Sequence, residues 1–273
     1  KDLFVNLFNI IGQNLKNYES CIEIGCSNGY VLRHLKDMGF KELVGIEPSI
    51  DRTKEVDDIL FLKEFVNAKL KFSRKYDLIF SVGVFEHIEE INNIIEFCRN
   101  NLNENGELFI CVPDAKRQLE EGDPALFSHQ HIHYYTENSI KYLLVKNGFI
   151  IKSLISKEDG LNVSAKIGKQ NIDSQKVFYS EYQKKLEIAL DKFKNIFQYK
   201  NRVVVHGVCN SLNNILGWLN KDFEFTLADN DITKHGKKYF NKIVKFISDI
   251  EIKNYDTVLI IPTVFYKEIM EDY

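Results

Sequence analysis

Apolar and polar positions in the first 113 residues follow two spacings that alternate along the chain. Short apolar runs predict strands at residues 21–24, 42–46, 59–62, 76–81 and 107–112. The helical candidates lie before and between these runs, at residues 3–15, 30–38, 51–56 and 88–101. Strands that alternate with helices are typical of a parallel sheet covered by helices on both faces. The predicted fold class is therefore α/β, with a doubly wound, mostly parallel sheet.

A long irregular stretch, residues 113–133, interrupts this alternation. Beyond it the pattern predicts a helix at 138–146, a hairpin of two strands at 149–156 and 161–167, and an amphipathic helix within 170–200. The alternation then restarts with strands at 202–206, 223–228 and 255–261 and a helix at 211–219. We expect three parts: a ligand-binding domain at 1–168, a helical connector at 169–200 and a smaller Rossmann-like α/β module at 201–273.

Composition narrows the class of protein. Of the 273 residues, 44% are hydrophobic and 27% charged, which is the balance of an ordinary globular chain. The 36 basic and 39 acidic residues are mixed along the chain, so no broad positive field is expected and neither is a nucleic-acid polymer as partner. No apolar run approaches the roughly 20 residues of a membrane span, and no signal pattern opens the chain, so we expect a cytoplasmic protein without a membrane partner.

The sharpest local pattern is Glu-Ile-Gly-Cys-Ser-Asn-Gly at residues 23–29, between a predicted strand and a predicted helix. Glycine lets the backbone approach a ligand, and the start of the following helix offers N–H groups to polar ligand atoms. A dinucleotide fingerprint needs glycine at positions 25, 27 and 30, and Gly25 alone fits. Glu47, at the end of the next predicted strand, suits both hydroxyls of a ribose. A turn that binds no ligand stays open as the alternative.

Together with residues 76–81, Phe85-Glu86-His87 and Asn105-Gly106, this loop and Glu47 resemble class I S-adenosylmethionine-dependent methyltransferases. The resemblance covers residues from about 8 to 166 and implies a seven-stranded Rossmann-like sheet, S-adenosylmethionine as cofactor and methyl transfer as the reaction. It implies contacts to the cofactor's methionine part from the loop, to its ribose after the second strand, to its adenine after the third and to its sulfonium after the fourth. These residues are Glu23, Gly25, Cys26 and Gly29, then Glu47 and Pro48, then Phe65, then Ser81 and Val82.

Residues 127–135, Phe-Ser-His-Gln-His-Ile-His-Tyr-Tyr, are similar to the histidine-containing segment of methyltransferases that act on nucleotide-linked sugars. Residues 203–207, 229–231 and 234–237 are similar to the C-terminal module of the same enzymes. This resemblance implies a small polar acceptor, such as a nucleotide sugar or glycan precursor, and a place in carbohydrate biosynthesis. Ser128 and Gln130 replace the tyrosine and glutamate usual there, so oxygen and carbon methylation both stay open. A module that binds the cofactor without turnover, or a methyltransferase for another small metabolite, is the alternative.

The histidines of this segment are the candidate catalytic residues. If the segment is extended, His129, His131 and His133 alternate onto one face. An imidazole accepts a proton near neutral pH, as a hydroxyl that attacks a methyl sulfonium requires, and His131 is the best candidate for general base. We expect no metal, because the segment contains no Cys, Asp or Glu to complete a ligand shell. We expect His87 to orient its loop rather than react, and a purely structural role for the histidines stays open.

Overall fold

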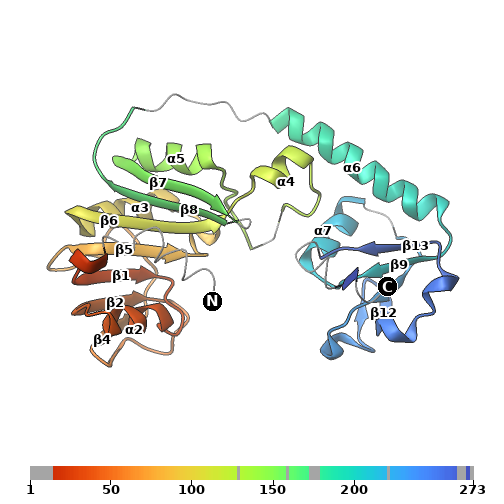
Figure 1. The fold of residues 1–273 in the computed structure, drawn as a ribbon, viewed down its shortest axis with the longest axis horizontal. Helices are drawn as coiled ribbons and strands as arrows, with labels where there is room; N and C mark the ends of the chain where they lie inside the picture. The colour runs from red at the N-terminus through yellow and green to blue at the C-terminus, as the bar shows by residue number, and fades with distance from the viewer. Residues whose placement is uncertain are drawn as a thin grey trace. The chain divides into compact units, whose positions relative to one another are not determined.

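The computed structural model describes residues 15–127, 130–157, 160–171, 179–219, 222–262 and 269–270 (Figure 1). The chain divides into two compact units. The first unit comprises Lys1–Lys116 and Gln130–Lys176, and the second unit comprises Arg117–His129 and Val177–Tyr273. In the described part of the chain, no helix has both the length and the apolar character that crossing a membrane requires.

The first unit is built on one sheet. Its strands are β1 (Ser20–Ile24), β2 (Glu42–Ile46), β3 (Lys54–Val56), β4 (Ile59–Leu62), β5 (Tyr76–Val82), β6 (Leu102–Pro113), β7 (Phe149–Lys157) and β8 (Gly160–Ile167). Their order across the sheet is β3-β4-β2-β1-β5-β6-β8-β7. The five central strands, from β4 to β6, pair in parallel, whereas β3, β8 and β7 pair antiparallel at the edges. The predicted doubly wound, mostly parallel α/β sheet is confirmed.

One predicted helix, residues 51–56, is wrong, and the sheet has eight strands where seven were expected. The segment forms the short edge strand β3, which pairs antiparallel with β4. Asp57 and Asp58 join the two strands, and both have a φ of 52°. Two consecutive residues with positive φ make a tight hairpin turn, and aspartate tolerates that conformation better than most residues. Local turn chemistry therefore overrides the helical interpretation.

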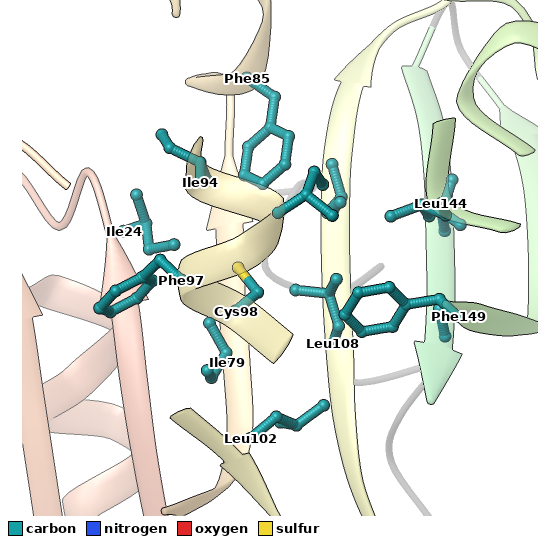
Figure 2. Close-up of a cluster of buried hydrophobic side chains, with 14 of the residues drawn as sticks. Ile24, Ile79, Phe85, Ile94, Phe97, Cys98, Leu102, Leu108, Leu144 and Phe149 are labelled. Atoms are coloured by element: carbon teal, nitrogen blue, oxygen red, sulfur yellow. The ribbon is translucent and has the colours of Figure 1, made fainter. Parts of the chain in front are cut away.

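Helices cover both faces of this sheet. Side chains alternate along each strand, so Ile79 of β5 belongs to one apolar cluster while its neighbours Leu78 and Phe80 belong to the other. Helix α2 (Tyr30–Asp37) packs into the cluster of Leu78 and Phe80. Helices α3 (Ile91–Asn101) and α5 (Glu137–Lys146) pack into the cluster of Ile79, where Figure 2 shows Phe97 of α3 and Leu144 of α5.

The second unit repeats the first half of the first. Its strands are β9 (Val203–His206), β10 (Thr226–Ala228), β11 (Lys238–Tyr239), β12 (Lys242–Lys245) and β13 (Thr257–Ile260), in the order β11-β12-β10-β9-β13. As in β3-β4-β2-β1-β5, four strands pair in parallel and the edge strand pairs antiparallel. Helix α7 (Asn210–Leu219) follows β9 as α2 follows β1. The backbone bond from Gly207 N to Ala228 O, 2.9 Å, matches that from Gly25 N to Ile46 O, 2.8 Å.

A segment from the irregular stretch after β6 belongs to the second unit. It begins at Arg117, the second residue of α4 (Lys116–Glu121), and packs against α6 (Tyr179–Tyr199), where the Tyr182 hydroxyl donates to the Asp123 carbonyl at 3.3 Å. The Phe127 ring lies 5.7 Å from that of Tyr182 and 6.3 Å from that of Trp218. The division expected from the sequence left this segment in the first domain. The boundaries near residues 168 and 200 stay a prediction.

Gly122 allows this close packing. Its φ is +69°, and a Cβ there would lie 2.3 Å from the Lys185 carbonyl carbon and 2.4 Å from the Leu186 nitrogen. We expect Gly122→Ala to lower the free energy of unfolding by about 1 to 3 kcal/mol, because the backbone of α6 must move and alanine disfavours positive φ.

Urea unfolding of the full chain measures this change. The control is Gly217→Ala in α7, where a Cβ meets no described atom within 4 Å. This control is expected to raise the free energy of unfolding by up to about 1 kcal/mol, because alanine is the better helix former. Equal effects of the two variants would contradict the packing role of Gly122.

Candidate functional site

The parallel strands of the first unit end at one edge, and the loop from β1 to α2 lies there in a conformation that needs glycine. Gly25 has a φ of 75° and Gly29 a φ of 76°. A Cβ on Gly25 would lie 2.3 Å from Val84 Cγ2, and a Cβ on Gly29 would lie 2.5 Å from the Phe61 ring. Gly29 also precedes α2 directly and has no side chain that would cover the first turn of the helix. The loop backbone is therefore close-packed on its inner side, and at the helix start the Asn28 side chain accepts from the first N–H of α2 at 3.1 Å.

Glu47 ties this loop to the end of β2. Its Oε2 accepts from Ser27 N at 3.1 Å, and its Oε1 accepts from Ser49 N at 3.0 Å and from Ser49 Oγ at 2.7 Å. Partial burial by itself would raise the pKa of Glu47, but the hydrogen bonds from Ser49 and Ser27 together lower it. The side chain is therefore an ionised acceptor held at the edge of the sheet.

A cavity of about 460 Å³ opens at the two loops that Glu47 joins. Ser27 and Ser49, the two residues bonded to the carboxylate, contribute to its wall together with Phe61 and Arg33. The walls thus come from the loop after β1, helix α2, the loop after β2 and strands β3 and β4. A small polar ligand that entered here would meet the two serines that hold the Glu47 carboxylate.

Glu23, on β1, is a buried carboxyl group with only 6% of its surface exposed. Its Oε2 has no hydrogen-bond partner among the residues that the structure describes. Burial raises the pKa of Glu23 strongly, and the charge of Glu47 raises it further. An unpaired carboxyl in this position would be stabilised by a cationic ligand group, such as an ammonium.

The other residues expected from the resemblance have different surroundings. Ser81 is buried, and its hydroxyl donates to the Ile24 carbonyl at 3.1 Å, which joins the ends of β5 and β1. Cys26 packs its sulfur into the core against Gly45, and burial raises its pKa to about 12. Cys26 therefore offers a ligand its backbone rather than its thiol. Phe65, after β4, exposes 77% of its surface.

Pro48 and Val82 lie at the same edge of the sheet. Pro48 follows Glu47 directly and is half-buried, and Val82 is the half-buried last residue of β5. Both are therefore within the group of strand ends that carries the glycine loop.

A second group of polar side chains lies beyond the end of β5. The short 3-10 helix η2 (Phe85–His87) begins there, and its Glu86 carbonyl accepts from Ile132 N at 2.7 Å and from His133 N at 3.1 Å. These bonds hold the histidine segment against η2. The rings of His87 and His131 lie 4.9 Å apart at 69°, and His87 Nε2 lies 3.9 Å from Glu86 Oε1.

The three predicted histidines do not share one environment. His131 lies in the group with Glu86 and His87, and burial, followed by the neighbouring His87, lowers its pKa. His133 has its Nε2 bonded to the Ile88 carbonyl at 2.8 Å. His129 lies outside the described residues. The described part of the segment contains a turn and is not a strand, so the regular alternation on which the prediction rested does not apply.

Glu86 is the residue of this group to which the sequence prediction gave no role in the site. It is far from the histidine segment in the chain, and no local pattern connects the two. The available signal was its position, because Glu86 and His87 follow a predicted strand of a parallel sheet, where ligands bind.

Comparisons with known proteins define the relatives of the chain. Residues 4–154 match the family described as "Methyltransferase domain". Curated relatives are named tRNA U34 carboxymethyltransferase. The Campylobacter concisus protein is 26% identical over 115 residues, which are 38% of this chain and 39% of the relative. The Nautilia profundicola protein is 28% identical over 105 residues, which are 36% of this chain and 35% of the relative. The chain thus spans less than half the length of the curated relatives it matches.

Solved structures with a similar fold include two methyltransferases. The S-adenosylmethionine-dependent methyltransferase of Mesorhizobium loti has 14% identity, with 54% of this chain and 90% of that one covered at a TM-score of 0.44. The 1,6-didemethyltoxoflavin-N1-methyltransferase of Burkholderia thailandensis has 13% identity, with 61% and 78% covered at a TM-score of 0.47.

The relatives overturn one expectation from the sequence. A tRNA is a nucleic acid, so names such as tRNA U34 carboxymethyltransferase contradict the prediction of a small-molecule acceptor without a nucleic-acid partner. That prediction rested on a net charge of -3, which describes the average of the chain and not the surface around one site. The resemblance to enzymes of nucleotide sugars is not confirmed.

The buried Glu23 generates a test of the site. Because its pKa is higher in the folded chain than its ordinary value of 4.5, its contribution to stability is complete below that value and is lost as the pH rises. We expect Glu23→Gln to remove this loss and to raise the free energy of unfolding at pH 7 by about 1 to 3 kcal/mol.

Urea unfolding at pH 5 and pH 8 measures the difference, with the exposed Glu55→Gln as control. A Glu23→Gln protein that is less stable than the parent at pH 8 would show that the carboxylate has a partner in the folded chain.

Proposed function

The chain belongs to the methyltransferase-domain family, and on that basis we propose that it transfers a methyl group from S-adenosylmethionine to an acceptor carried by RNA. The match of residues 4–154 confirms the resemblance to class I methyltransferases and identifies the cofactor and the class of enzyme. The RNA acceptor is supported by the names of the curated relatives.

We assign the cofactor to the point where the strand order reverses. The chain proceeds from β1 to β2 on one side and later adds β5 on the other, and in such sheets ligands bind beyond the carboxyl ends at this point. Gly25 and Val84, which touch there, belong to the loops that follow β1 and β5. The single observation that carries the assignment is Glu47, an ionised carboxylate that binds Ser27 and Ser49, two residues of the cavity wall.

Each part of the cofactor has a matching group. The ribose hydroxyls are assigned to Glu47, the ammonium to the buried Glu23, and the carboxylate to the backbone from Gly25 to Gly29. The exposed Phe65 ring is assigned to the adenine. The sulfonium then faces the end of β5, at Ser81 and Val82.

The acceptor is assigned to the side of the sulfonium where η2 and His131 lie. In the transfer, a lone pair of the acceptor forms a bond to the methyl carbon, the electron pair of the bond from that carbon to sulfur goes to sulfur, and the acceptor's proton passes to His131. His131 is the proposed catalytic side chain, because it belongs to the polar group beyond β5. His133, bonded to the Ile88 carbonyl, is assigned to holding the segment, and His129 stays a candidate.

The second unit is proposed to bind the acceptor and not the cofactor. Asp229, at the end of β10, occupies the position that Glu47 has after β2, and its Oδ2 accepts from Val208 N at 2.8 Å. Lys234 Nζ lies 3.0 Å from that carboxylate oxygen and 3.1 Å from the Val208 carbonyl. A lysine thus fills the space at which a ribose would bind, which favours a different role for this unit.

We expect Glu47→Ala to weaken S-adenosylmethionine binding by about 10- to 100-fold, because two hydrogen bonds to a charged acceptor are lost. Calorimetric titration measures the affinity. Glu42→Ala is the matched control, since Glu42 lies at the opposite end of the same strand and pairs with Arg74. An affinity unchanged in Glu47→Ala would remove the ribose assignment.

We expect the full chain to transfer radioactive label from methyl-labelled S-adenosylmethionine to unmodified tRNA. The label should become soluble in acid after ribonuclease treatment and should co-migrate with a nucleoside after digestion. Label that appears in small metabolites and never in RNA would contradict the acceptor proposal while leaving the cofactor assignment intact.

We expect His131→Ala to reduce turnover by about 10²- to 10⁴-fold with S-adenosylmethionine affinity nearly unchanged, as is typical of a group that acts on the reacting atoms. His34→Ala, on the exposed face of α2, is the control. Turnover within a few-fold of the parent in His131→Ala would end the catalytic assignment.

A further inference from the structure

We propose that Glu86, His87 and His131 form a binding site for a divalent transition-metal cation, with Zn²⁺ the ion that fits best. One ligand atom from each of the three side chains lies within 4.8 Å of the other two. Glu86 and His87 come from η2 and His131 from the histidine segment. We expected no metal because residues 127–135 contain no Cys, Asp or Glu, whereas the folded chain supplies a carboxylate from η2.

The carboxylate of Glu86 has the environment of an unfilled ligand. Glu86 exposes only 3% of its surface, and its Oε2 lacks a hydrogen-bond partner among the described residues. Buried polar atoms are nearly always paired, and a buried carboxylate without a partner is unfavourable. Its other oxygen, Oε1, lies 3.9 Å from His87 Nε2. A bound cation between these groups would satisfy the carboxylate.

The ring of His87 is also oriented to bind a cation. Its Nδ1 lies 2.7 Å from the Gln130 carbonyl, which only accepts hydrogen bonds, so Nδ1 carries the hydrogen and Nε2 the lone pair. That lone pair is on the atom nearest to Glu86. Histidines that bind metals almost always donate their other N–H group to a carbonyl or carboxylate in this way.

The backbone holds the two segments together, so the site does not depend on free loops. The Glu86 carbonyl accepts from Ile132 N and His133 N, and the Tyr135 hydroxyl donates to the Phe85 carbonyl at 3.3 Å. In a tetrahedral zinc site with bonds of about 2.1 Å, neighbouring ligand atoms are about 3.4 Å apart. The three side chains therefore need to approach one another by roughly 1 Å, which side-chain rotation provides.

The donor set selects the class of ion. Two imidazole nitrogens and one carboxylate oxygen suit Zn²⁺ and its transition-metal neighbours, whereas Mg²⁺ and Ca²⁺ prefer oxygen ligands. Three protein ligands leave a fourth position open, as in catalytic zinc sites.

The role of the cation in methyl transfer rests on the proposed function, which places the acceptor beside His131. With the cation bound, His131 is a ligand and not the base, and an acceptor hydroxyl at the open position would release its proton to solvent more readily. Its oxygen then bonds to the methyl carbon as the bond from carbon to sulfur breaks, and the electron pair of that bond goes to sulfur.

The test is a calorimetric titration of the full chain, without an affinity tag and after treatment with EDTA, with Zn²⁺ alone. We expect one Zn²⁺ per chain. Glu86→Gln and His131→Ala should each weaken binding by about 100-fold or more, beyond the 10- to 100-fold typical of residues that only orient a ligand. His34→Ala, which removes an exposed imidazole outside the site, should leave the affinity unchanged.

Circular dichroism verifies that each variant is folded, and Co²⁺ absorption spectra report the ligand geometry independently of affinity. A folded parent protein that binds no Zn²⁺ or Co²⁺ stoichiometrically would overturn the proposal, and so would equal affinity of the parent and Glu86→Gln.

The two proposals fail separately. Stoichiometric Zn²⁺ binding without methyl transfer to RNA supports the metal site and contradicts the RNA acceptor. Methyl transfer to RNA that EDTA does not reduce, in a protein that binds Zn²⁺, overturns the role of the cation in the reaction and leaves the proposed function intact.

Discussion

The close contact between Gly25 and Val84 is the constraint on which the site depends. Gly25 has positive φ, and a Cβ there would lie 2.3 Å from Val84, so no other residue fits without displacement of the loop after β5. Two hydrogen bonds next to this contact join the ends of β1, β2 and β5. Gly25 N donates to the Ile46 carbonyl of β2, and Ser81 of β5 donates to the Ile24 carbonyl of β1. The residues assigned to the cofactor and the group of Glu86, His87 and His131 therefore lie at the same edge of the sheet, which these hydrogen bonds hold together.

The two units share one strand order, but the acidic residue that follows the second parallel strand has different surroundings in each. In the first, the acid after the second parallel strand, Glu47, is half-buried and binds Ser27 and Ser49, which both line a cavity. In the second, Asp229 is 8% exposed and is bonded to Val208 N, Asp231 N and Lys234 Nζ. Each carboxylate accepts three hydrogen bonds, but one of the donors to Asp229 is a lysine ammonium. The difference depends on a single lysine within the second unit, which the strand order alone does not reveal.

The sequence predicted those features that depend on local patterns. The bounds of β2 and β4 agree with the predicted runs 42–46 and 59–62, because buried parallel strands are continuous in apolar residues. The glycine loop was recognised because its conformation requires specific residues. Residues 51–56 were misassigned, because the positive φ of Asp57 and Asp58 was not anticipated. The partnership of Glu86 with His131 depends on hydrogen bonds between distant segments, for which the sequence has no periodic signal.

The most direct test of the central claim is a crystal structure of the full chain with S-adenosylhomocysteine. We expect the ribose hydroxyls within hydrogen-bond distance of Glu47, the amino group beside Glu23 and the sulfur directed toward the group formed by Glu86, His87 and His131. Because the second unit repeats the same strand order, the crystal contains a second edge of a parallel sheet to which the ligand can bind. Density for the adenosyl group at Gly207 and Asp229, with the edge of the first sheet free of ligand, would contradict the account.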